Sequence, residues 1–143
     1  MMYEEWLAHF NPNHDPRNGQ FTRKQAGAIV KSAKKAIKKG IYTDEAKPYI
    51  NDIKSMVDDK ELNRLISKVS DNWSDYQSIH YDWRDGLASD KELEDAADRW
   101  HKALDEKDER AFAISKNVLN TMGIHDEVFE TRLMAIIGSP KGT

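Results

Sequence analysis

The chain has 143 residues, of which 33% are charged, and it contains no cysteine. A chain of this length buries about two-thirds of its unfolded surface, so one domain can fold without a disulfide or a metal. The absence of cysteine excludes a disulfide framework and a thiolate zinc site. No apolar run approaches the roughly 18 residues of a membrane span, and the first residues lack the pattern of a secretory signal, so we expect neither.

The net charge of −3 conceals an uneven distribution of charge along the chain. Residues 1–40 hold eight Lys and Arg against three acids, whereas residues 41–143 hold 14 basic and 22 acidic residues. A basic leading segment on an acidic body can contact nucleic acid, an acidic partner or its own body. The sequence leaves these three alternatives open.

Turn-forming residues crowd the start of the chain. Pro16 follows Asp15, which is a turn signal because proline presets φ and the Asp side chain bonds to the backbone ahead of it. Asn18 and Gly19 form a second turn signal because both tolerate positive φ. We therefore predict a compact, irregular, turn-rich arm over residues 1–22.

Metal or catalytic chemistry in this arm would need further groups elsewhere in the chain. His9, His14 and Asp15 are metal-ligand types, but a site needs three or four ligands converging on one point, and no second cluster accompanies them. The chain also lacks a Gly-x-Ser-x-Gly motif, a Cys nucleophile and a Gly-rich phosphate loop. We expect no metal, no cofactor and no catalytic residue, and a metal-dependent hydrolase is the least favoured hypothesis.

A helix is predicted over residues 23–39. Thr22 is a good N-cap for it, and Gly40 suits the position just after its last turn. Its apolar residues fall at helical spacing, but few are large, so we expect a peripheral helix. Its polar face carries four candidate residues for an electrostatic site, Lys31, Lys34, Lys35 and Lys38. Nucleic acid is an alternative partner for this face, but a solvated or self-docked face is favoured because no aromatic residue accompanies the lysines.

A second, shorter helix is predicted to begin at Thr43 or Asp44. Pro48 lies in its first turn, where a missing N–H group costs little. We expect this helix to break at Asp58 and Asp59, before the strongest pattern of the chain begins.

That pattern consists of two seams in which core-type residues alternate at spacings of four and three. The first seam stops at Gly86 and contains Leu62, Ile66, Val69, Trp73, Tyr76, His80 and Trp83. The second follows a capping box from Ser89 to Glu92 and contains Leu93, Ala97, Trp100, Leu104, Lys107, Ala111, Ile114 and Val118. Two long helices joined by about four residues pack antiparallel, so we predict a long helical hairpin.

Several details of the hairpin follow from its spacing. Lys107 interrupts the second seam. Residues 90–122 therefore form either one helix with a polar segment in its middle or two helices separated by a break near residues 105–108. His80 falls at core spacing, and so do four aromatic residues that could frame a pocket, Trp73, Tyr76, Trp83 and Trp100. Packing rather than ligand binding is therefore the favoured role for all five. A last helix is predicted over residues 126–137. The fold class is therefore all-α, with a helical domain over residues 23–138 and a flexible tail over residues 139–143.

Residues 11–22, NPNHDPRNGQFT, resemble a short segment that recurs near the ends of structural and head-associated proteins of tailed bacteriophages from Gram-positive hosts. The positions that fit are Asn11, Asn13, His14, Asp15, Pro16, Asn18, Gly19, Gln20 and Phe21. The resemblance covers about a dozen residues and does not extend to the helical body. It implies a phage origin and a modular docking or packaging element rather than an active site.

On this interpretation the arm is a preorganised element that binds a partner, with exposed aromatic anchors at its ends. The residues assigned to this role are Phe10, Asn13, His14, Asp15, Arg17 and Phe21. We expect a small, non-enzymatic phage protein that acts by protein–protein interaction and is associated with the virion head. The alternative is a phage-encoded inhibitor of a host defence system, of the anti-CRISPR type, that occludes a protein or nucleic-acid-binding surface. The first hypothesis implies a head component as the partner and the virion as the location. The alternative implies a host defence effector and the bacterial host cytoplasm. Both leave open whether the hairpin also associates with a second copy of the chain.

Overall fold

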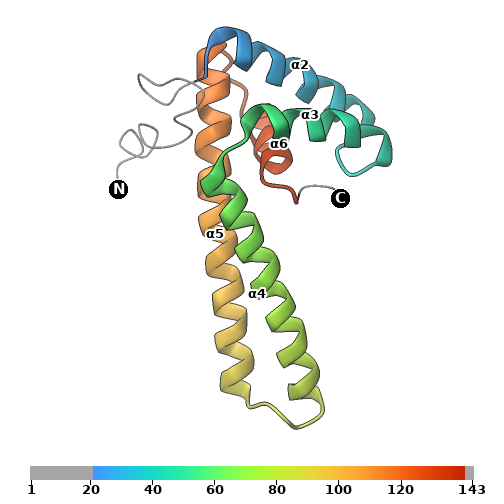
Figure 1. Cartoon of the computed structure of the whole chain (residues 1–143), viewed down its shortest axis with the longest axis vertical. Coiled ribbons are helices and arrows are strands. Elements are labelled where there is room, and N and C mark those ends of the chain that lie inside the picture. The colour runs from blue at the N-terminus through green and yellow to red at the C-terminus, as the bar shows by residue number, and fades with distance from the viewer. Residues whose placement is uncertain (1–20, 141–143) are drawn as a thin grey trace.

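A computed structural model describes residues 21–140 of the chain. Within this range every regular element is helical, which confirms the predicted all-α class. The elements are α2 (Arg23–Lys39), the short 3₁₀ helix η1 (Asp44–Ala46), α3 (Lys47–Val57), α4 (Lys60–Arg84), α5 (Asp90–Thr121) and α6 (Glu127–Ile137). Figure 1 shows α4 and α5 as a long hairpin, with α2, α3 and α6 gathered around one end of it.

The predicted bounds of α2 are confirmed, and local chemistry explains both of them. The Thr22 hydroxyl accepts a hydrogen bond from the Gln25 backbone N–H, and the Gln25 side chain accepts one from the Thr22 N–H, so the two form a capping box. At the other end Gly40 has a φ of 93°, a conformation that a residue with a Cβ rarely adopts. The helix therefore begins and ends where its sequence predicts.

The junction between α3 and α4 lies at the predicted pair of aspartates. Pro48 is in the first turn of α3, as expected. Asp58 ends that helix in the left-handed conformation, with a φ of 35°. Asp59 then caps α4, because its carboxylate accepts the Leu62 backbone N–H at 2.8 Å. Two adjacent residues of one type thus close one helix and open the next.

The hairpin contains two uninterrupted helices, so the alternative of two shorter helices over residues 90–122 is wrong. Ser89 and Glu92 form the predicted capping box at the start of α5. Lys107 does not break the helix, since its ammonium group reaches the Asp108 carboxylate at 3.3 Å while the rest of its side chain is largely covered. The long, flexible stem of lysine can lie along apolar surface and keep its charge at the edge.

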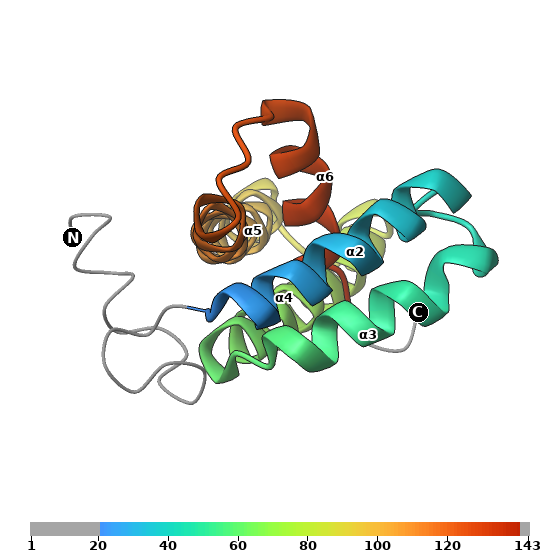
Figure 2. The ribbon, with the colours of Figure 1, turned by 90° about the horizontal axis from the view of Figure 1, so that it is seen from above.

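The hydrophobic core lies at the end of the hairpin where α2, α3 and α6 gather (Figure 2). Its fully buried members include Ile29, Ile53, Ile114, Leu133 and Ile136, which come from all four of α2, α3, α5 and α6. The expected peripheral position of α2 is wrong. Its small apolar residues are buried because they let neighbouring helices approach closely, and they are Ala26, Ala33 and Ala36.

The body begins at Phe21, which lies within the predicted arm. The Phe21 side chain is 3% exposed and belongs to the core, and its backbone N–H donates to the Asn117 side-chain oxygen at 3.2 Å. Its assignment as an exposed partner-binding anchor is therefore corrected: the apolar ring is satisfied by the protein's own core. The rest of the predicted arm, residues 1–20, lies outside the described residues.

The end of the body is held by α3. The Lys54 ammonium group donates a hydrogen bond to the Ile137 carbonyl at 3.1 Å and another to the Ser139 carbonyl. The Ser139 hydroxyl donates to the Ile136 carbonyl at 2.7 Å. Ser139, the first residue of the predicted flexible tail, is therefore tied to the body, while residues 141–143 lie outside the described range.

Candidate functional site

The hairpin extends well beyond the gathered helices α2, α3 and α6 (Figure 1). Its distal half carries a set of neighbouring rings. Beyond Leu65 on α4, the described residues of the hairpin's distal half bury only small side chains, those of Ala96 and Ala103 on α5. The remaining space at the seam is filled by large aromatic side chains. We call this set the aromatic ladder; it consists of Trp73, Tyr76, His80 and Trp83 on α4 and Trp100 on α5.

The rings of the aromatic ladder contact one another in sequence. The centroid of Trp100 lies 4.6 Å from that of Trp73 and 5.7 Å from that of Tyr76. Along α4, the Tyr76 and His80 centroids are 6.1 Å apart, and those of His80 and Trp83 are 5.8 Å apart. These separations fall in the range of favourable ring contacts. The predicted packing role of these residues is therefore confirmed as far as their contacts with one another are concerned.

Packing leaves the aromatic ladder partly open to solvent. Trp73 and Trp83 are each 39% exposed, and the neighbouring Tyr81 is 55% exposed. A shallow groove of about 220 Å³ runs beside the ladder, lined by Trp73, Tyr76, Gln77, His80 and Tyr81. The seam pattern predicts which helix faces meet but not how many helices surround them. In the described part of the chain α4 and α5 alone meet here, so the large rings extend past their interface.

The tip of the hairpin is fixed by polar contacts of the same aromatic residues. The Trp83 indole N–H donates to the Asp90 carboxylate at 2.6 Å, which connects the last turn of α4 to the first turn of α5. The Arg84 guanidinium lies over the Tyr81 ring at 5.0 Å from its centroid, a cation–π contact. Trp83 therefore has a structural role at the tip, whereas Trp73 contacts the rings of Tyr76 and Trp100 and has no side-chain hydrogen bond within residues 21–140.

A second candidate surface lies on α2, on the body. Lys31, Lys34, Lys35 and Lys38 are all exposed and follow one another at spacings of three, one and three residues, which places them on one side of a helix. We call these four residues the basic face. α2 contains seven basic and no acidic residues, whereas residues 40–140 contain 13 basic and 22 acidic residues. The structure therefore confines a strong positive charge to one helix.

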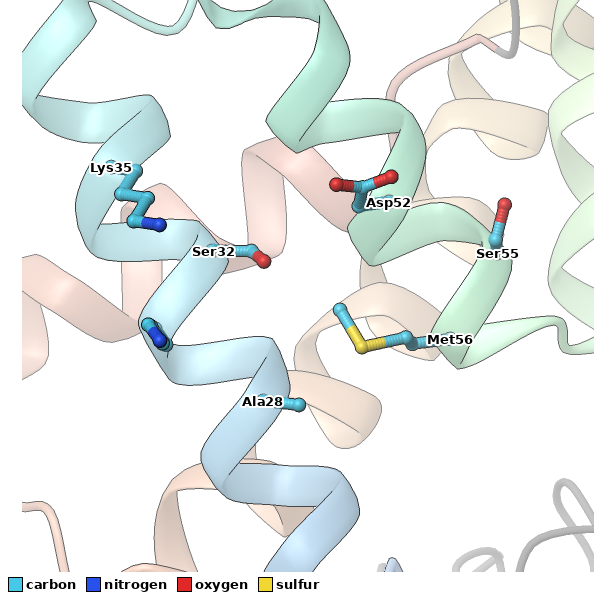
Figure 3. A pocket seen from close by; sticks show the side chains of 7 residues that line it. Ala28, Ser32, Lys35, Asp52, Ser55 and Met56 are labelled. Carbon is cyan, nitrogen blue, oxygen red and sulfur yellow. The ribbon is translucent and has the colours of Figure 1, made fainter.

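A groove of about 430 Å³ separates the basic face from α3 (Figure 3). Lys31, Ser32 and Lys35 line its α2 wall, and Asp52, Ser55 and Met56 line its α3 wall. Figure 3 shows Ser32 and Lys35 on one helix across the gap from Asp52 and Met56 on the other. The Lys35 ammonium group lies 5.8 Å from the centroid of the Tyr49 ring. The groove is thus lined by two ammonium groups, two hydroxyl groups and one carboxylate.

One buried charge pair was not anticipated from the sequence. The Arg110 guanidinium contacts the Asp59 carboxylate at 2.9 Å, and the two side chains are 9% and 1% exposed. Arg110 lies within the acidic run DEKDER, where a solvated helix face is the ordinary interpretation. Because both groups are buried and paired, this contact joins α4 to α5 and leaves no open site for a ligand.

The other predicted site residues lie outside the described part of the chain. Phe10, Asn13, His14, Asp15 and Arg17 all precede residue 21. Among residues 21–140, no three His, Asp or Glu side chains come together as metal ligands would. In the same range no helix has both the length and the apolar character needed to cross a bilayer.

Comparison with known proteins adds no assignment. No protein-family model matches the chain, and neither the curated proteins nor the solved structures that were compared contain a match to it. The two surfaces described above and the resemblance of residues 11–22 to a phage segment are therefore the features from which a function can be inferred.

Proposed function

We propose that this chain is a small, non-enzymatic bacteriophage protein that acts by binding another protein through the aromatic ladder of its hairpin. The observation that carries the proposal is the 39% exposure of Trp73 in a row of contacting rings far from the core. Tryptophan and tyrosine are enriched among the residues that dominate protein-binding energy. Exposed apolar patches of this kind mark interaction surfaces.

The geometry of the ladder defines the kind of partner that fits. The rings contact one another in a row along the hairpin, beside a shallow groove rather than a deep cavity. A groove of this form suits an amphipathic helix that places apolar residues every three or four positions against it. Because the rings already contact one another, few side-chain rotamers must be ordered on binding, which favours affinity.

We assign the phage context and the virion location to the arm, from its resemblance to the head-associated segment. The arm joins the body at Phe21, whose ring is fixed in the core beside Asn117. A docking segment attached at a rigid point leaves the hairpin available to a second partner. In this proposal the arm binds a head component, and the ladder binds the functional target.

Inhibition of a host defence effector is the second candidate function, and the charge of the hairpin favours it. α5 contains nine acidic and six basic residues, and among the exposed acids are Glu94, Asp98 and Asp105. An acidic rod can occupy a cationic groove that normally binds nucleic acid, since complementary potentials steer such contacts. In this case the partner is found in the host cytoplasm.

The decisive experiment for the ladder is affinity capture from phage-infected cells with the full chain and two variants. We expect Trp73→Ala to lose the captured partner, because it removes an exposed ring that contacts both Tyr76 and Trp100 in the ladder. Phe112→Ala is the matched control, since Phe112 is also 39% exposed and lies on α5 away from the ladder. Circular dichroism confirms that both variants fold. Equal capture by all three proteins would refute the assignment of the site.

The virion location has a separate test. Mass spectrometry of purified virions is expected to detect the full chain but not a chain that lacks residues 1–20. The shortened chain keeps Phe21 and the Thr22 cap, so its body retains the contacts described above. Absence of the full chain from virions, together with capture of a defence protein through the ladder, would replace head association with inhibition.

A further inference from the structure

We propose that the basic face binds the phosphate backbone of double-stranded nucleic acid without reading its sequence. This inference concerns α2 and does not rest on the function proposed for the hairpin. It starts from the distribution of charge: α2 holds seven basic residues and no acid, on a body whose remaining charge is strongly negative. Such segregation creates a local positive potential that net charge alone does not reveal.

The four lysines of the basic face are free to contact an external ligand. All are exposed, and within residues 21–140 none of them makes an ion pair, although Lys39 at the end of the same helix pairs with Glu45 at 4.0 Å. Lys35 alone makes a ring contact, with Tyr49. α2 therefore packs against the other helices through its apolar side. Those contacts leave the four lysines of the basic face without a neutralising charge.

The length of the face suits a polyanion rather than a single phosphate. Lys24 is also exposed and extends the row by two turns of helix, so the lysines span about 21 Å at a rise of 1.5 Å per residue. Duplex DNA carries one phosphate per about 1.7 Å of its axis, so a stretch of this length holds about a dozen phosphates, of which those on the near side can face the row. A straight helix laid across the backbone can therefore contact several phosphates at once.

The chemistry of lysine favours nucleic acid over an acidic protein. Lysine is depleted at protein–protein interfaces, whereas interfaces with DNA are polar and strongly positive. Its ammonium group is a point charge on a flexible stem, which tolerates the varied positions of phosphates along a backbone. α2 carries no aromatic side chain on which an unpaired base could stack. The Tyr49 ring beside it is half-buried and already in contact with Lys35, so a duplex suits the face better than a single strand.

The groove beside the basic face sets a limit on where phosphates lie. Its α2 wall offers Lys31, Lys35 and the Ser32 hydroxyl, but Asp52 stands on the α3 wall. Phosphate is repelled by this carboxylate, so the backbone is expected along the outer side of the lysines. Asp52→Asn removes this repulsion and is therefore expected to tighten binding to the duplex by about two- to threefold at low salt.

The test measures binding of the full chain to a fluorescent duplex of about 30 base pairs over a series of salt concentrations. The four lysines of the basic face contribute about −3.6 to the slope of log K against log salt, so their contacts alone weaken binding about 150-fold between 50 and 200 mM. A variant with Lys31→Gln, Lys34→Gln, Lys35→Gln and Lys38→Gln is expected to bind at least about tenfold more weakly at low salt, and its slope should be shallower than that of the unmodified chain by about 3.6.

The matched control removes the same charge from the hairpin. It carries Lys60→Gln, Lys91→Gln, Arg99→Gln and Lys102→Gln, all at exposed positions on α4 and α5. It is expected to keep the affinity and slope of the unmodified chain within about twofold, because screened charges outside the interface contribute little. Equal weakening by both quadruple variants would show an effect of net charge and overturn the proposal.

Two further outcomes also decide the question. Binding of polyglutamate by the unmodified chain as tightly as duplex at the same salt would assign the face to an acidic protein, and the proposal would fail. Failure of the unmodified chain to bind duplex at low salt would overturn it directly. Trp73→Ala is expected to leave duplex binding unchanged, which separates this test from that of the hairpin.

Discussion

Arg110 and Asp59 form a buried, two-point ion pair at the place where the hairpin enters the body. One terminal nitrogen of the Arg110 guanidinium donates to both carboxylate oxygens of Asp59, at 2.9 and 3.2 Å, and its Nε donates to one of them at 3.3 Å. The same carboxylate accepts the Leu62 backbone N–H and caps α4. One aspartate thus sets both the start of α4 and its position against α5.

Loss of the Asp59 carboxylate is expected to destabilise the protein strongly. Asp59→Ala leaves the Arg110 charge buried without this partner, which costs about 3–5 kcal/mol in comparable cases, and it removes a cap worth about 1 kcal/mol. Urea unfolding followed by circular dichroism measures the loss. Glu61→Gln is the control, because Glu61 pairs with Arg64 on the exposed side of the same helix. Similar stabilities for the two variants would contradict the role of the buried pair.

The Glu61–Arg64 pair gives a prediction about pH. The hydrogen bond from Arg64 at 2.6 Å lowers the pKa of Glu61, the charges of Arg64, Arg110 and Lys68 lower it further, and burial opposes them. A carboxyl whose folded pKa is lowered adds stability above its unfolded pKa and loses that contribution as pH falls through the folded pKa.

Glu61→Gln should therefore cost a small amount of stability at neutral pH and none in acid below the lowered pKa of Glu61. The cost is small because both side chains are largely exposed, at 43% and 59%, and solvent screens such pairs. Urea titrations of both proteins across acidic pH test this difference. A gap between the two midpoints that widens toward low pH would have the wrong sign.

Phe21→Ala distinguishes a core residue from a docking anchor. The ring is 3% exposed, so its removal is expected to cost about 3–5 kcal/mol of unfolding free energy, whereas Phe21→Leu should cost much less because most of the volume is kept. Thermal unfolding measures both. If Phe21 instead served as an exposed anchor, the alanine variant would keep its melting temperature and lose only partner binding.

Features set by neighbouring residues were predictable from the sequence. α2 begins after Thr22 because the Thr22 side chain accepts a hydrogen bond from an otherwise unpaired backbone N–H of the first turn. It ends before Gly40 because glycine tolerates the φ of 93° found there. Pro48 fits the first turn of α3 for an equally local reason. The alternation of four and three residues likewise indicated that α4 and α5 pair, although the buried Ala96 and Ala103 of α5 each precede a predicted seam position, Ala97 and Leu104, by one residue. Such rules act within a few residues and need no knowledge of the tertiary structure.

Features set by the tertiary structure were not predictable in the same way. The place of Trp73 in a predicted seam does not reveal how many helices surround it. In the structure it lies between α4 and α5 and remains 39% exposed. Arg110 lies in an acidic run that resembles a solvent face, yet its partner is 51 residues away in the chain. Phe21 lies beside turn-forming residues, but its contact with Asn117 depends on the placement of α5.

The two ends of the hairpin should differ in local stability. The proximal part of α5 buries Ile114, Val118 and Leu119 in the core, whereas the distal part buries mainly Ala96 and Ala103. Segments with few buried apolar contacts open locally at a lower free energy than the core does. Hydrogen exchange is therefore expected to be faster for amides of residues 73–100 than for those of residues 111–119.

Binding at the aromatic ladder should reverse much of this difference. A partner that covers Trp73 and Tyr76 adds apolar contacts where the hairpin has few, so exchange over residues 73–100 should slow while residues 111–119 change little. Mass spectrometry of exchange with and without the captured partner makes the comparison. Protection that appears on α2 instead would place that partner on the basic face and exclude the ladder as its site.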